Sequence, residues 1–359
     1  MHGVRELTKL GQSIWLDSIS RQLIDSGTLS HYINDVGITG LTSNPSILAH
    51  AIGHSDDYNA ALARFEAQGV HDAEEMVYEL AIVDLTDAAT LLHDVWERTQ
   101  GRDGFVSIEV PPEYANAVPE TISWARRLRS RFDLENVLIK VPGTAAGTQA
   151  IRELIADGIG VNVTLLFGVK HYVAAATAFL DGLELRQRAG LSLDVPSVAS
   201  VFVSRWDSAA NPRLPDGLKQ RAGLTVMQAI WAAHQQILAT ERCQQLCNGS
   251  DRMQRVLWAS TSTKDPAYPD TFYVAALAAP GTVDTIPEAT LLAFDDHGVP
   301  DSVLDDPLAE SELMSARLEE AGLHLEQLAD ELQVNGAQSF TADWNELLDS
   351  VALKLKGAS

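Results

Sequence analysis

The chain has 359 residues, 46% of them hydrophobic and 21% charged, which is typical of a globular protein with a large core. It carries 49 acidic and 26 basic residues, a net charge of −23. This charge argues against nucleic-acid or anionic-membrane partners, because both require basic surfaces. No apolar run reaches transmembrane length, and the first residues lack a signal-peptide pattern. Cys243 and Cys247 lie one helical turn apart, which favours structural thiols and a cytoplasmic protein.

Eight apolar or β-branched runs, bounded by turn residues, predict strands. They lie at 13–17, 37–42, 105–110, 137–141, 160–167, 198–203, 256–260 and 282–286, the last being the weakest. Helical patterns cover 4–11, 18–34, 55–67, 72–99, 115–131, about 144–156, 169–188, 217–247 and 270–278, with an acidic helical region at 288–356. Strands that alternate with helices predict a parallel sheet. We therefore expect a single (β/α)8 TIM barrel over residues 1–359, with extra N- and C-terminal helices.

The strand at 137–141 contains one lysine, Lys140, and ends in a Pro-Gly turn. In a buried strand this side chain is expected to point inward, where burial favours the neutral amine. A neutral amine can attack a carbonyl and form an imine. The alternative is a lysine at a strand end that extends to solvent.

Polar residues recur at the ends of the predicted strands, where barrel enzymes place their chemistry. They are Asp17, Thr42, Asn44, Glu109, Lys140, Asn162, Thr164, Ser200, Arg205 and Ser260. Imine chemistry on a sugar needs an amine, two acid/base groups, and polar groups for the hydroxyls. Each residue also has an ordinary alternative: the carboxylates, Asn and Thr could cap helices or turns, and Arg205 could pair with Asp207.

Two weaker motifs carry no function. The segment 143–148, Gly-Thr-Ala-Ala-Gly-Thr, lacks the lysine of a P-loop and predicts a strand-to-helix turn. His50 and His54 are one helical turn apart but have no evident third metal ligand.

With these residues placed, most of the chain resembles transaldolase. The resemblance rests on Thr-Ser-Asn-Pro-Ser at 42–46, Val-Leu-Ile-Lys-Val-Pro at 137–142, Gly-Val-Asn-Val-Thr-Leu-Leu-Phe at 160–167 and Ser-Val-Phe-Val-Ser-Arg at 200–205. The segment 259–266, Ala-Ser-Thr-Ser-Thr-Lys-Asp-Pro, is similar to the long bacterial form found in actinobacteria and cyanobacteria.

The resemblance implies a class I aldolase-type barrel without a metal or organic cofactor. It would move a dihydroxyacetone unit from sedoheptulose 7-phosphate to glyceraldehyde 3-phosphate, giving erythrose 4-phosphate and fructose 6-phosphate in the non-oxidative pentose phosphate pathway. By position, the resemblance implies that Lys140 carries the imine, that Glu109 and Thr164 handle the catalytic water, and that Asp17 exchanges the proton at the cleaved bond. It also implies that the dihydroxyacetone unit is bound by Asn44, Asn162 and Ser200, that Phe202 lines the site, and that Arg205 binds phosphate. Thr42 could bind a substrate hydroxyl or a catalytic water. A monomer or homodimer is expected.

One position departs from the family. Ser262 stands where much of the family has an arginine, so we expect Lys264 to supply the second phosphate cation, with Ser260 or Ser262 adding hydrogen bonds. Lys264 could instead pair with Asp265 or point to solvent. Two other functions stay open: an aldolase that releases free dihydroxyacetone, and a barrel that binds sugar phosphates without catalysis.

Overall fold

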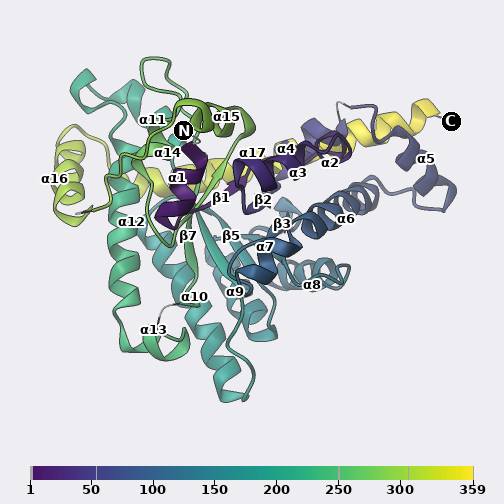
Figure 1. Ribbon diagram of the computed structural model, residues 1–359, viewed down its shortest axis with the longest axis horizontal. Coiled ribbons are helices and arrows are strands. Elements are labelled where there is room, and N and C mark those ends of the chain that lie inside the picture. Colours follow the sequence, from purple (N-terminus) through teal and green to yellow (C-terminus); the bar gives the residue numbers. More distant parts are fainter. Residues whose placement is uncertain (1–2, 54, 250, 306, 359) are drawn as a thin grey trace.

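Eight parallel strands follow one another around a closed barrel in the computed structural model, which describes residues 3–53, 55–249, 251–305 and 307–358 (Figure 1). They are β1 (Ser13–Leu16), β2 (Gly40–Thr42), β3 (Val106–Glu109), β4 (Val137–Pro142), β5 (Val161–Leu166), β6 (Ser197–Phe202), β7 (Arg255–Ala259) and β8 (Val283–Ile286). β1 pairs with β8 and closes the barrel. The predicted (β/α)8 barrel is confirmed, including its weak eighth strand.

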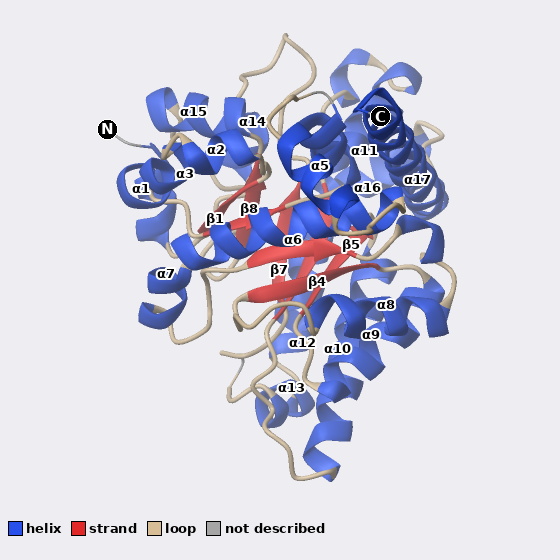
Figure 2. Cartoon of the chain, turned by 90° about the vertical axis from the view of Figure 1, so that its right-hand side faces the viewer, coloured by secondary structure: helices blue, strands red, loops and turns tan. Residues whose placement is uncertain are grey.

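Helices surround the strands on the outside of the barrel (Figure 2). The α-helices are α1 (Gly3–Leu10), α2 (Arg21–Asp25), α3 (Thr28–His31), α4 (Pro45–Leu48), α5 (Asn59–Ala67), α6 (Ala73–Leu91), α7 (His93–Arg98), α8 (Val118–Arg129), α9 (Ala145–Asp157), α10 (Val169–Arg188), α11 (Ser204–Ala210), α12 (Ala222–Leu238), α13 (Glu241–Leu246), α14 (Phe272–Ala276), α15 (Glu288–His297), α16 (Pro307–Glu320) and α17 (Leu325–Ala358). Two short π-helices (Tyr32–Val36 and Ala49–Gly53) and three 3₁₀ turns (Pro112–Tyr114, Asn211–Arg213 and Asp216–Leu218) complete the elements. None of the helices in the described part of the chain is both long and apolar enough to cross a membrane.

The register of the central strands brings polar side chains together inside the barrel. Glu109 on β3 pairs with Lys140 on β4, and Lys140 pairs with Asn162 on β5. Residues at one register level of a parallel sheet point to the same face. The three side chains therefore form one row within the barrel.

Several predicted helices are divided in the structure. The segment 18–34 breaks at Gly27, whose left-handed φ of 78° ends one helix and starts the next. The acidic region 288–356 forms three helices, α15, α16 and α17, and Gly322 at φ 85° lies in the last break. β2 begins at Gly40 rather than residue 37, because Gly37 ends a π-helix with φ 102°. The spacing of apolar residues continues across these breaks, so the sequence pattern did not indicate them.

Two smaller predictions about local structure hold. Segment 143–148 forms the turn into α9, where the Thr144 hydroxyl caps the helix by accepting a hydrogen bond from the Gly147 amide. Cys243 and Cys247 are free and buried, as expected for structural thiols.

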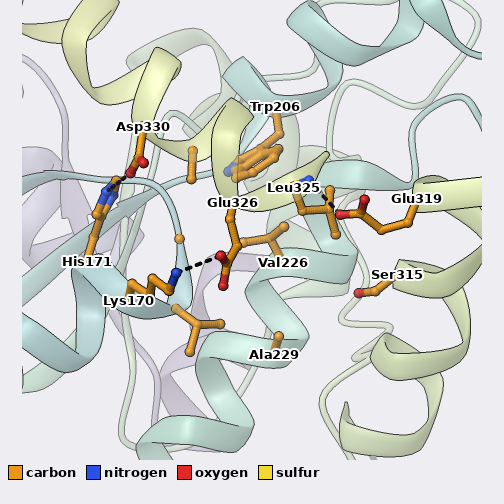
Figure 3. Close-up of a pocket in the computed structure, with 13 residues that line it drawn as sticks. Lys170, His171, Trp206, Val226, Ala229, Ser315, Glu319, Leu325, Glu326 and Asp330 are labelled. Carbon is orange, nitrogen blue, oxygen red and sulfur yellow. Dashed lines mark hydrogen bonds and ion pairs between the residues drawn. The ribbon is translucent and has the colours of Figure 1, made fainter. Parts of the chain in front are cut away.

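The C-terminal helix α17 lies across the C-terminal ends of β4 and β5 (Figure 1). Gln333 donates hydrogen bonds to the carbonyl of Gly143 at 3.1 Å and to that of Leu165 at 2.9 Å. Its first turns contact α10 through the ion pair Lys170–Glu326 at 2.6 Å and a hydrogen bond of 3.0 Å between Nε2 of His171 and Oδ1 of Asp330, beside a mainly apolar cleft of about 300 Å³ (Figure 3). These contacts fix the helix over the mouth of the barrel.

Candidate active site

A cavity of about 240 Å³ opens at the C-terminal mouth of the barrel. It is lined by Asp17, Thr42, Asn44, Ser46, Ile47, Lys140, Thr164, Ser200, Phe202, Arg205, Ala259, Ser260, Ser262, Lys264, Thr285, Pro287 and Phe340. All the site residues expected from the sequence are on its wall except Glu109 and Asn162, which lie in the row that includes Lys140. The strand-end residues therefore converge on one volume.

Lys140 points into the barrel rather than to solvent, as predicted. It is 4% exposed. Its Nζ lies 3.3 Å from Oε2 of Glu109 and donates a hydrogen bond of 3.1 Å to the carbonyl of Ser43. A lysine amine held beside a carboxylate can lose a proton to it and then act as a nucleophile.

Glu109 is a buried carboxyl whose two oxygens accept no hydrogen bond from the described residues. Burial raises its pKa to about 7; the neighbouring Lys140 ammonium opposes this shift, and Asp17 adds to it. A carboxyl that titrates near neutrality can both donate and accept a proton during a reaction cycle. Its position beside Lys140 suits it to proton transfer at the amine.

Asp17 follows β1 and forms a second acidic centre in the cavity. Burial raises its pKa, while Lys140, a hydrogen bond from Thr42 and Arg205 oppose this shift. The Thr42 hydroxyl donates to Oδ1 of Asp17 at 2.7 Å, and Oγ1 of Thr285 lies 2.6 Å from that of Thr42. Since the single proton of Thr42 is used toward Asp17, Thr285 is the donor to Thr42. This chain of hydroxyls orients the Asp17 carboxylate.

Asn162 occupies a place behind the cavity wall and holds Ser200. Its Oδ1 accepts a hydrogen bond of 2.7 Å from the Ser200 hydroxyl, and its Nδ2 donates one of 3.1 Å to Oγ of Ser107. Thr164, by contrast, lines the cavity, and its buried Oγ1 has no hydrogen-bond partner among the residues described. An unsatisfied hydroxyl at this point is suited to hold a water molecule.

Asn44 has two expected roles, as the cap of a helix and as a ligand for the substrate. It caps α4, since its Oδ1 accepts a hydrogen bond of 3.0 Å from the amide of Ile47, and Pro45 occupies the first turn of the helix. Its Nδ2 is not needed for the cap. Asn44 can therefore cap α4 through Oδ1 while its Nδ2 stays available to bind a substrate.

Arg205 lies between two aromatic rings at the far side of the cavity. Its guanidinium carbon is 5.0 Å from the ring centre of Phe202 and 5.7 Å from that of Phe340. Burial lowers its pKa, against the opposing charges of Asp343 and Asp17. Asp207, the alternative partner, instead accepts a hydrogen bond of 2.7 Å from Tyr273. Within the described chain the guanidinium makes no hydrogen bond, so its donors are open to an anion.

Ser260, Ser262 and Lys264, which follow the end of β7, also line the cavity. Ser260 has a left-handed φ of 59°, which is strained for a serine, and its hydroxyl lies 2.9 Å from that of Ser204. Lys264 forms no ion pair with Asp265 in the described structure; Asp265 accepts a hydrogen bond from the amide of Ala267 instead. Lys264 is exposed and Arg205 half-buried, and both line the cavity.

Sequence reasoning missed part of the wall, most importantly Thr285, Ser46 and Phe340. Phe340 comes from α17, where one apolar residue on an amphipathic helix gives no sign of a role in a site. For the histidine pair, His54 lies outside the described residues. Among those that are described, no group of three or more His, Cys, Asp or Glu side chains is placed to hold a metal ion.

Comparisons with known proteins identify the family of the chain. The family model "Transaldolase/Fructose-6-phosphate aldolase" matches residues 14–351. The "Transaldolase" of Parafrankia sp. (strain EAN1pec) is 39% identical over 363 residues, covering 99% of this chain and 98% of that protein. "Transaldolase 1" of Streptomyces coelicolor is 41% identical, covering 98% of this chain and 94% of its own. The "Transaldolase" of Thermobifida fusca is 40% identical, covering 98% of both chains.

Proposed function

The chain belongs to the transaldolase/fructose-6-phosphate aldolase family, and from this membership and the cavity we propose that it is a transaldolase. It moves a dihydroxyacetone unit from sedoheptulose 7-phosphate to glyceraldehyde 3-phosphate through an imine on Lys140. The products are erythrose 4-phosphate and fructose 6-phosphate, as in the non-oxidative pentose phosphate pathway. One observation carries the proposal: a buried lysine 3.3 Å from a carboxyl, in a cavity that also presents an arginine without an ion pair among the described residues.

Imine formation uses Lys140 and Glu109. Glu109 takes a proton from the ammonium, and the free amine attacks the ketone carbon to give a carbinolamine. Glu109 then returns a proton to the leaving hydroxyl, which departs as water. Thr164 holds this water through its unpartnered Oγ1. Hydrolysis of the product imine reverses these steps.

Cleavage and transfer use Asp17. Its carboxylate takes the proton of the hydroxyl at the cleaved bond, and the carbon–carbon electron pair moves into the imine. The first aldose phosphate leaves, and an enamine stays on Lys140. The enamine carbon then attacks the acceptor aldehyde, and Asp17 returns its proton to the new alkoxide. Lys140 and the Thr42 hydroxyl hold Asp17 ready for this exchange.

Substrate binding divides between two parts of the cavity. Ser200, positioned by Asn162, and the free amide group of Asn44 hold the hydroxyls of the dihydroxyacetone unit. Thr42 lies near the same hydroxyls, and Phe202 forms a wall. Arg205 binds the phosphate, with Lys264 as the second cation and Ser260 as a hydrogen-bond donor. In a chain of net charge −23, paired cations are needed to attract an anionic sugar.

The remaining properties follow from the same proposal. The enzyme acts in the cytoplasm on sugar phosphates, as a monomer or homodimer, without a metal or organic cofactor. The alternatives are an aldolase that releases free dihydroxyacetone and a barrel that only binds sugar phosphates.

An assay with and without acceptor separates these functions. Purified protein is incubated with fructose 6-phosphate, and products are measured with and without erythrose 4-phosphate. We expect sedoheptulose 7-phosphate to form only with the acceptor. Equally fast release of dihydroxyacetone in its absence would favour the aldolase, and no turnover would favour the binding barrel.

A further inference from the structure

Phe340 of α17 is the residue that links the two cationic parts of the cavity. Its ring centre lies 5.7 Å from Nζ of Lys140 and 5.7 Å from the guanidinium carbon of Arg205. The side chain is 3% exposed, yet it lines the cavity. A buried ring at this point gives the cavity an apolar surface close to both the lysine and the arginine.

The ring is held there by the close packing of α17 on the barrel. A methyl group added at Gly336, one turn before Phe340, would lie 3.0 Å from Leu165 and 3.4 Å from Arg205. One turn after Phe340, the ring of Trp344 packs against that of Tyr78 with the ring centres 5.3 Å apart, and the Tyr78 hydroxyl donates to the carbonyl of Glu109 at 3.1 Å. The helix therefore cannot rise far from the cavity without losing contacts on both sides of Phe340.

The proposed reaction creates a need for such a cover. After cleavage, the enamine on Lys140 can react in two ways. It can attack the acceptor aldehyde, which is transfer. It can also take a proton from water on its carbon, forming an iminium ion that a second water hydrolyses to dihydroxyacetone and the lysine ammonium. The second reaction consumes the unit without transferring it, so the enzyme gains from keeping bulk water away while the acceptor binds.

We propose that Phe340 sets the partition between transfer and release by covering the enamine. This inference rests on the proposed function and deepens it. In the proposed function Glu109 and Thr164 hold the water that reacts at the imine carbon, so a cover formed by Phe340 leaves that water in the site and does not prevent the first or last step. Phe340 is thus a specificity-determining residue that excludes water instead of exchanging protons.

The test is a series of variants with a shrinking side chain: Phe340→Leu, Phe340→Val and Phe340→Ala. Each is given fructose 6-phosphate and erythrose 4-phosphate, and free dihydroxyacetone and sedoheptulose 7-phosphate are measured together. We expect the ratio of release to transfer to rise along the series, by at least about tenfold in Phe340→Ala. The ratio is independent of how much protein is folded, because both products come from the same active molecules.

Leu347→Ala is the matched control. Leu347 is fully buried on the same stripe of α17 but does not line the cavity. Its truncation removes a similar apolar side chain from the packing of α17 but keeps the phenyl ring, so its ratio is expected to stay near that of the unmodified protein. A ratio that rises as much as in Phe340→Ala would overturn the assignment to the ring.

The two proposals fail in different ways. If the unmodified protein transfers the unit but the ratio is unchanged across the Phe340 series, the inference about Phe340 is wrong and the proposed function stands. If the unmodified protein shows no acceptor-dependent transfer, the proposed function is wrong and the inference falls with it.

Discussion

Two half-buried arginines at opposite ends of the barrel differ in their hydrogen bonds: within the described residues Arg255 at the N-terminal end makes several, and Arg205 at the C-terminal mouth makes none. Arg255 donates hydrogen bonds to the carbonyls of Thr282 at 2.9 Å and Gly281 at 3.1 Å, and to the Ser13 hydroxyl at 2.6 Å. Arg205 has only the faces of two aromatic rings and makes no hydrogen bond within the described part of the chain. Burial lowers the pKa of both.

The carboxylates at the two ends differ in the same way. Asp103, near Arg255, accepts hydrogen bonds from Nε1 of Trp15 at 2.7 Å and from the Ser13 hydroxyl. Glu109 accepts none from the described residues, although it lies 3.3 Å from Lys140. Leaving buried polar groups unpaired costs stability. The N-terminal cluster therefore serves the fold, and the C-terminal cluster retains binding capacity for a substrate.

The largest expected effect comes from neutralising the two carboxyls of the mouth. Asp17→Asn should still form the imine but cleave the carbon–carbon bond slowly, while Glu109→Gln should slow imine formation itself. Loss of a general acid/base costs about 10²–10⁴-fold in rate. Rapid-quench trapping of the imine, compared with the rate of transfer, separates the steps. If Asp17→Asn slowed only imine formation, the two roles would have to be exchanged.

The second prediction compares what Arg255 and Arg205 contribute to stability and to activity. Arg255→Met should lower the free energy of unfolding by about 1–3 kcal/mol, because it leaves the buried carbonyl of Thr282 and the Ser13 hydroxyl without their donor. Arg205→Met should change stability little but strongly weaken the use of phosphorylated donors. Urea unfolding and steady-state kinetics measure the two effects. Similar stability losses in both variants would show that the comparison of the two ends is wrong.

The third prediction concerns Lys264 at the rim of the mouth. Lys264→Ala should raise KM for fructose 6-phosphate and change little for unphosphorylated fructose. A charge-assisted hydrogen bond is worth roughly 1.5–3 kcal/mol, or about ten- to a hundredfold. An equal loss for both sugars, or none for either, would place the phosphate elsewhere.

The sequence alone predicted the strands and most of the polar residues that line the cavity, because buried strands and polar residues at strand ends have local signals. It could not predict the contribution of α17, since Phe340 meets Lys140 across 200 positions of chain and its helix gives only an amphipathic pattern. Nor could it show that Asn162 bonds to Ser107 and Ser200, because those hydrogen bonds depend on side-chain geometry.

The smallest expected effect concerns Asp284 on β8, a buried carboxyl that does not line the cavity. Thr261 donates to its Oδ1 at 2.9 Å, and Oδ2 has no partner among the described residues. Burial raises its pKa from 3.8 to about 8; Thr261 opposes this shift, and Asp17 adds to it. The native carboxyl thus keeps a proton that the unfolded one releases, so stability falls as pH rises between these two values.

Asp284→Asn should remove this fall, because the amide keeps the hydrogen bond from Thr261 and cannot ionise. From pH 6 to pH 7 the variant should gain at most about 1.4 kcal/mol relative to the unmodified protein. Urea unfolding at both values measures the gain. A constant difference would mean that Asp284 is ionised in the native protein.

The central claim, that Lys140 carries the imine, is tested most directly by borohydride reduction in the presence of fructose 6-phosphate, followed by peptide mapping. Reduction converts the imine to a stable amine, and the account predicts a three-carbon adduct on the peptide that contains Lys140. Lys140→Arg should give no adduct and no transfer, because its guanidinium stays protonated and cannot attack. An adduct on another lysine, or none on the unmodified protein, would contradict the account.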